Sequence, residues 1–121
     1  MYRYIEVIQN LLPLLSTLEE GLVHIKKQLS ELRYEEALGL LEDCLLAIAS
    51  IEAALQPMAE LSLEKVFSLT ATLKAACEKV VATCEKENPE QAEIIISTQL
   101  LPVFQEWKSE LEKILTPYIS S

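Results

Sequence analysis

The fold is decided first by residues 5–32, which read IEVIQNLLPLLSTLEEGLVHIKKQLSEL. Apolar side chains recur in this stretch at steps of three and four residues, at Ile5, Ile8, Leu12, Leu15, Leu18, Leu22, Ile25, Leu29 and Leu32. This period places them on one face of an α-helix, which is typical of a helix that packs against a core. Pro13 lies inside the pattern without shifting its phase, so we expect one helix with a kink at Pro13.

Two further helices follow along the chain. The second is expected from Tyr34 to about Gln56, because Pro57 enforces a stop. The third is expected to begin after Ser62, whose hydroxyl is suited to accept a bond from an unpaired backbone N–H as the N-cap. It is expected to end around Glu87.

The fourth helix has the clearest beginning. Asn88 is a favoured N-cap residue, and Pro89 suits the first helical position. Pro102 lies within this helix as Pro13 lies within the first, and we expect a second kink there. The apolar stripe again advances by three and four residues, through Ile96, Leu100, Phe104, Trp107, Leu111, Ile114 and Tyr118.

Length and composition agree with a helical protein of one domain. The chain has 121 residues, half of them hydrophobic, and only two are glycine, too few for the tight turns of a β-sandwich or barrel. Four segments joined by short links predict an all-α fold, an antiparallel up-down four-helix bundle formed by residues 1–121. The alternative is a pair of helical hairpins that complete their core only by dimerising.

The charge of the chain argues against several partners. Its formal net charge is −9, and no basic run exceeds Lys26-Lys27, so binding to nucleic acid or to an anionic membrane is disfavoured. The longest uncharged stretch, residues 7–18, is shorter than the roughly 20 residues of a membrane span. A charge near the N-terminus interrupts any signal sequence, so we expect a cytoplasmic protein.

The residue types that carry catalysis or bind metal are sparse. His24 is the only histidine, and with Glu20 it forms an i,i+4 pair typical of an exposed helix face. Cys44, Cys77 and Cys84 lie on apolar stripes without a Cys-x-x-Cys spacing, which predicts reduced thiols packed in the core. There is no glycine-rich phosphate loop. We therefore expect no catalytic residue, no cofactor and no metal site.

The second half of the second helix is more apolar than one buried face requires. Residues 44–55 are interrupted only by a serine and a glutamate. This half is either a central, well-covered helix or part of an interface. The candidate interaction surface comprises four residues of this helix and a tryptophan of the fourth helix, namely Leu46, Ala47, Ala53, Ala54 and Trp107. Trp107 has two interpretations, as a core residue or as a partly exposed anchor for a partner.

These observations favour a non-enzymatic protein–protein interaction module, a small acidic helical adaptor or chaperone-like protein. Its partner is either an amphipathic helix of another protein or a second copy of the chain, in a homodimer. The alternative is a small-molecule or lipid carrier with a cavity inside the bundle. A third hypothesis is an enzyme that uses buried carboxylates.

Overall fold

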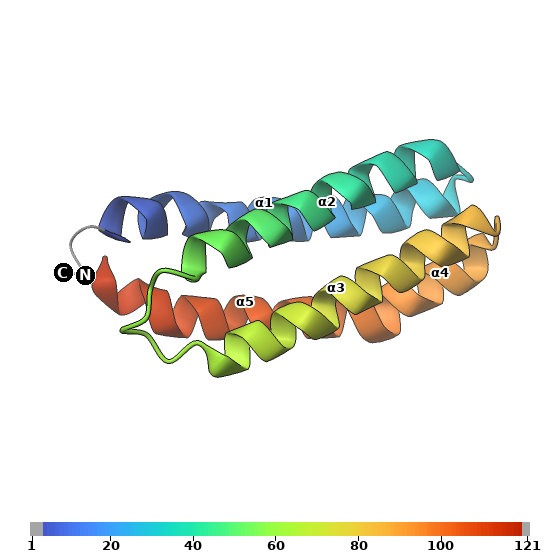
Figure 1. Cartoon of the computed structure of the whole chain (residues 1–121). Coiled ribbons are helices and arrows are strands. Elements are labelled where there is room, and N and C mark those ends of the chain that lie inside the picture. The colour runs from blue at the N-terminus through green and yellow to red at the C-terminus, as the bar shows by residue number, and fades with distance from the viewer. Residues whose placement is uncertain (1–3, 120–121) are drawn as a thin grey trace.

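The computed structural model describes residues 4–119, and all regular structure in that part of the chain is helical (Figure 1). The elements are α1 (Ile5–Ser30), α2 (Tyr34–Leu55), α3 (Glu64–Glu85), α4 (Pro89–Ile95), a π-helical turn (Ile96–Leu100), α5 (Leu101–Leu115) and a 3-10 turn (Thr116–Tyr118). Helix α4, the π-helical turn and α5 follow one another without a break and make up the expected fourth helix. The predicted all-α helical bundle is confirmed.

Successive helices run in opposite directions along the bundle (Figure 1). Helix α1 packs against α2 on one side and against the fourth helix, formed by α4 and α5, on the other, and α3 packs against α2 and against the same fourth helix. Each helix therefore has two neighbours and one open side. The turns at residues 31–33 and 86–88 lie at one end of the bundle, and the link at residues 56–63 lies at the other (Figure 1).

The largest side chains of the core come from α5. Phe104 and Trp107 are fully buried, with ring centroids 5.7 Å apart. The indole N–H of Trp107 donates to Thr70 Oγ1 of α3 at 2.8 Å, and the Thr70 hydroxyl donates to the Val66 carbonyl at 2.8 Å. A buried indole N–H without an acceptor would cost free energy, so this bond lets Trp107 fill the core between α3 and α5.

The two internal prolines are accommodated differently. Helix α1 stays continuous past the exposed Pro13, and a kink there stays a prediction. In the fourth helix a π-helical turn ends two residues before Pro102, and the Leu101 N–H donates to the Ile96 carbonyl, five residues back. Pro102 has no N–H to continue the ordinary i→i−4 pattern. The wider turn lets the helix bury both Ile95 and Ile96.

The helix ends test the expected caps. Asn88 is the N-cap of α4, and its Oδ1 accepts from the Gln91 N–H at 3.3 Å, as predicted. Ser62 is not a cap, because α3 begins one residue later than that cap requires, with Leu63 at the N-cap position. The Leu63 side chain is buried, so its packing outweighs the roughly 1 kcal/mol that a serine cap contributes.

Helix α1 ends earlier than its apolar stripe suggests, because Leu32 has φ of 61° and leaves the helix. The Arg33 N–H donates to the Gln28 carbonyl at 2.9 Å, and the Leu32 N–H donates to the Leu29 carbonyl at 3.1 Å. This pair of bonds is a Schellman motif, which favours glycine at the left-handed position. Glu87, with φ of 54°, occupies the same position after α3.

Candidate interaction surface

Helices α1 and α2 expose apolar side chains on their open sides. Val7 and Leu14 of α1 are 36% and 45% exposed, and Leu46 of α2 is 68% exposed. Leu46 lies two residues from both Cys44 and Ile48, which are buried, so at 100° per residue it points away from the core. We define the α1–α2 surface as Val7, Leu14, Leu46, Ala47, Ala49, Ser50, Ala53 and Ala54.

A shallow groove of about 230 Å³ runs between the two helices within this surface. Its walls are formed by Val7, Asn10 and Leu14 of α1 and by Ser50 and Ala54 of α2, above the buried Leu11 and Ile51. The groove exists because α2 places small side chains opposite the larger apolar side chains of α1. Small residues let another backbone approach closely, so the groove suits a helix better than a polar ligand.

Charged side chains are sparse in the two stretches of chain that form this surface. Residues 7–18 of α1 include no charged residue, and residues 44–59 include only Glu52. The Glu52 carboxylate accepts a hydrogen bond from Lys74 Nζ of α3 at 2.9 Å, on the side of α2 that faces α3. The exposed Glu42 and Asp43 directly precede the second of these stretches, on a chain whose formal net charge is −9.

The structure brings four of the five predicted residues together. Leu46 and Ala53 are exposed and Ala47 and Ala54 are half-buried, all on the part of α2 that faces away from the core. Trp107 is fully buried on α5, so its inclusion in the interaction surface was wrong. Its interpretation as a core residue is confirmed.

Sequence reasoning missed Val7 and Leu14, which form the α1 side of the surface. The signal was present, because both lie one position away from the buried residues Ile8 and Leu15 and are seven residues apart. Two apolar residues seven apart occupy one line along a helix. Their exposure depends on where α2 packs, which periodicity alone does not provide.

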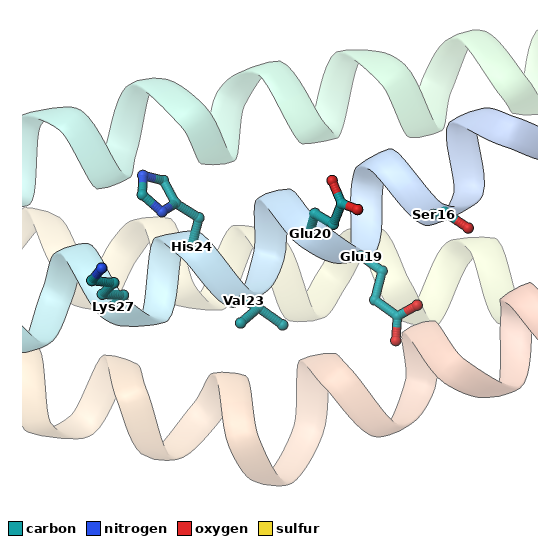
Figure 2. A pocket seen from close by; sticks show the side chains of 6 residues that line it. All are labelled: Ser16, Glu19, Glu20, Val23, His24 and Lys27. Atoms are coloured by element: carbon teal, nitrogen blue, oxygen red, sulfur yellow. The ribbon is translucent and has the colours of Figure 1, made fainter.

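The pair Glu20 and His24 lines an exposed hollow of about 550 Å³ on α1 together with Ser16, Glu19, Val23 and Lys27 (Figure 2). The Glu19 side chain turns instead toward α5, where it accepts hydrogen bonds from Lys108 Nζ at 2.8 Å and from Gln105. The bond from Lys108 lowers the pKa of Glu19. Among the described residues, no group of three His, Cys, Asp or Glu side chains is placed to hold a metal ion.

The three cysteines are buried and free, as the apolar stripes predicted. Burial raises the pKa of the Cys44 thiol to about 11 and that of the Cys77 thiol to about 12. Burial also raises the pKa of Cys84. Because only the thiolate is a good nucleophile or metal ligand, these side chains act at neutral pH as apolar packing groups.

In residues 4–119, no helix combines the length and the apolarity needed to cross a bilayer. The model of a protein family described as a domain of unknown function, DUF8042, matches residues 6–110. No curated protein and no solved structure matches the chain. The matched range includes every residue of the α1–α2 surface and most of the bundle. This chain therefore belongs to the DUF8042 family.

Proposed function

We propose that this protein is a non-enzymatic protein–protein interaction module, a small acidic helical adaptor or chaperone-like protein of the cytoplasm that binds its partner through the α1–α2 surface. One observation carries the proposal. Leu46 is 68% exposed near the beginning of the stretch at residues 44–59, in which Glu52 is the only charged residue, on a strongly acidic chain. Exposed apolar patches rimmed by polar residues commonly mark interaction sites.

The energetic argument follows from what a partner would cover. Removing apolar surface from water contributes about 25 cal/mol per Å². Leu14 offers such surface within the uncharged residues 7–18, and Leu46 offers it one turn beyond the exposed Glu42 and Asp43. The small side chains of Ala53 and Ala54 allow a partner helix to approach α2 closely. A helix that presents an apolar face is thus the partner that this surface favours.

The alternative, a small-molecule or lipid carrier, gains no support from a particular cavity. The hollow between α3 and the π-helical turn has a volume of about 420 Å³. It is lined in part by the exposed polar side chains of Thr72, Lys79 and Gln99, and Lys79 Nζ donates to Gln99 Oε1 at 3.3 Å. The exposure of these side chains makes it a hollow at the surface that is open to solvent, whereas a lipid chain needs an enclosed apolar cavity.

Site-specific photo-crosslinking in the native cell tests the proposal. The photoreactive residue p-benzoyl-phenylalanine replaces Leu14 or Leu46 in the α1–α2 surface, and in two controls it replaces Val23 or Ser109. Val23 is 53% exposed on α1 outside the surface, and Ser109 is exposed on α5. We expect a discrete protein adduct from positions 14 and 46 and none from positions 23 and 109. Equal yields at all four positions would contradict the proposal.

A further inference from the structure

We propose that a second copy of this chain occupies the α1–α2 surface, with the two α2 helices packed antiparallel about a twofold axis that passes between Ala49 and Ser50. The inference rests on the proposed function, because it names the partner of the same surface. It follows from three features: the sizes of the outward side chains of α2, the positions of its carboxylates, and the position of Leu14 along α1, next to the centre of α2.

The outward line of α2 is complementary to itself in this register. Leu46 and Ala53 lie seven residues apart, about two helical turns, and both are exposed. An antiparallel pair centred between Ala49 and Ser50 sets Leu46 of each copy opposite Ala53 of the other, a large side chain against a small one. A pair shifted to centre on Leu46 would set Leu46 against its own counterpart and Ala53 against Gly39. That register opposes large to large and small to small, and it packs poorly.

The charges of α2 favour the same arrangement. In the antiparallel register, Glu42 lies opposite Pro57 of the second copy and Asp43 lies opposite its Gln56. No carboxylate of α2 meets another carboxylate. A parallel pair would instead hold Glu42 and Asp43 of each copy level with their own counterparts, which costs several kcal/mol when like charges are brought together. Two chains of net charge −9 can therefore associate here without opposing their acidic groups.

Helix α1 extends the interface beyond α2. Leu14 lines the same groove as Ser50, so it lies at the level of the proposed axis. The axis then brings Leu14 close to its counterpart, within the uncharged stretch of α1 at residues 7–18. A twofold interface uses the same patch on both copies and closes at two, so the assembly does not grow into a filament.

Light scattering over a tenfold range of concentration tests the dimer. We expect the wild-type protein to have twice the mass of the chain, and Leu46→Glu to have the mass of one chain. Ala53→Lys tests the opposing residue and should also be monomeric. Val23→Glu introduces the same charge as Leu46→Glu outside the surface and should remain dimeric. Circular dichroism verifies that each variant keeps its helical content.

Introduced cysteines test the axis. Ser50→Cys should form a disulfide between two copies, because the two residues at position 50 face each other across the axis. Leu46→Cys alone should not, because its counterpart lies about 10 Å away along the helix, beyond disulfide reach. Mixing Leu46→Cys with Ala53→Cys should form the mixed disulfide. The buried native thiols should not react, and Ser109→Cys is the exposed control.

The outcomes separate the two proposals. A wild-type protein that is monomeric throughout the concentration range overturns the dimer. If position 46 still crosslinks in the cell to a different protein, the proposed function stands without the dimer. Efficient disulfide formation by Leu46→Cys alone, with none by Ser50→Cys, overturns the proposed axis. A dimer that persists in both Leu46→Glu and Ala53→Lys places the interface elsewhere and overturns this inference.

Discussion

Thr70 and Trp107 form the polar contact that joins α3 to α5 inside the core. The Thr70 hydroxyl accepts from the indole N–H while it donates to the carbonyl of its own helix. Replacing Thr70 by valine keeps the volume but leaves a buried indole N–H without an acceptor. We expect Thr70→Val to lower the free energy of unfolding by about 1–3 kcal/mol, measured by urea denaturation.

The control for this change lies two residues along α3. Thr72 is exposed, and its hydroxyl donates to the Ser68 carbonyl at 3.2 Å, a bond within its own helix that joins α3 to no other element. Thr72→Val should change stability by less than about 0.5 kcal/mol, as is usual for surface substitutions. Equal effects of the two substitutions would show that the loss at Thr70 comes from helix propensity rather than from the indole contact.

At the scale of the elements, the turn between α1 and α2 holds a leucine where the motif favours glycine. Leu32 has φ of 61° and its side chain is 63% exposed, so the side chain contributes little packing to offset the backbone strain. We expect Leu32→Gly to raise the free energy of unfolding by about 0.5–1 kcal/mol, after the greater flexibility of glycine in the unfolded chain is subtracted. Thermal and urea unfolding both measure this gain.

Introducing a glycine two residues earlier in the chain should have the opposite effect on the free energy of unfolding. Ser30 lies in the last turn of α1, in a helical conformation that gives glycine no advantage. Ser30→Gly should therefore destabilise the protein by up to about 0.5 kcal/mol. If Leu32→Gly also destabilises it, the strain assigned to Leu32 is not released by glycine, and the expectation fails.

The elements were predictable where one local signal acted alone. Asn88 followed by Pro89 predicted the start of α4 because cap and first turn are adjacent in sequence. The start of α3 was displaced because Leu63 is buried by other helices, which a local signal from Ser62 does not include. The π-helical turn was missed for a similar reason, since burying both Ile95 and Ile96 requires a phase change that averaged periodicity conceals.

At the scale of the whole molecule, the same limit applies to the candidate surface. From the sequence, the apolar second half of α2 could be either covered by other helices or exposed at an interface. Periodicity identifies the apolar face of a helix but not how many helices pack against it. Helix α2 packs against α1 and α3, and its remaining side carries Leu46 and Ala53 to the outside. Trp107 occupies a stripe of the same kind on α5, yet that stripe faces the core. Only the assembled bundle distinguishes the two.

Because of the buried thiols, the stability of the whole bundle should decrease with rising pH in the alkaline range. Folding raises the pKa of Cys44 to about 11 and of Cys77 to about 12, above their ordinary value of 9.0. The unfolded chain therefore loses these protons first, so stability should be complete below pH 9 and should fall as the pH rises toward 11 and 12. Urea midpoints at pH 8, 9 and 10 measure this decline.

Cys77→Ala isolates the contribution of one thiol. The variant keeps every other ionisable group of the wild-type protein, so a difference between the two proteins reports on this thiol. The variant should therefore lose less stability between pH 8 and pH 10 than the wild type. Parallel declines in the two proteins would assign the alkaline loss to other groups.

The topology also determines where other sequences can be attached. Because the helices alternate in direction, the described chain begins at Tyr4 and ends at Ile119 at the same end of the bundle (Figure 1). The turns that contain Leu32 and Glu87 lie at the opposite end. A fluorescent protein or affinity tag fused to either terminus would therefore be tethered at one end only, leaving the far turns accessible for immobilisation or for an inserted reporter loop.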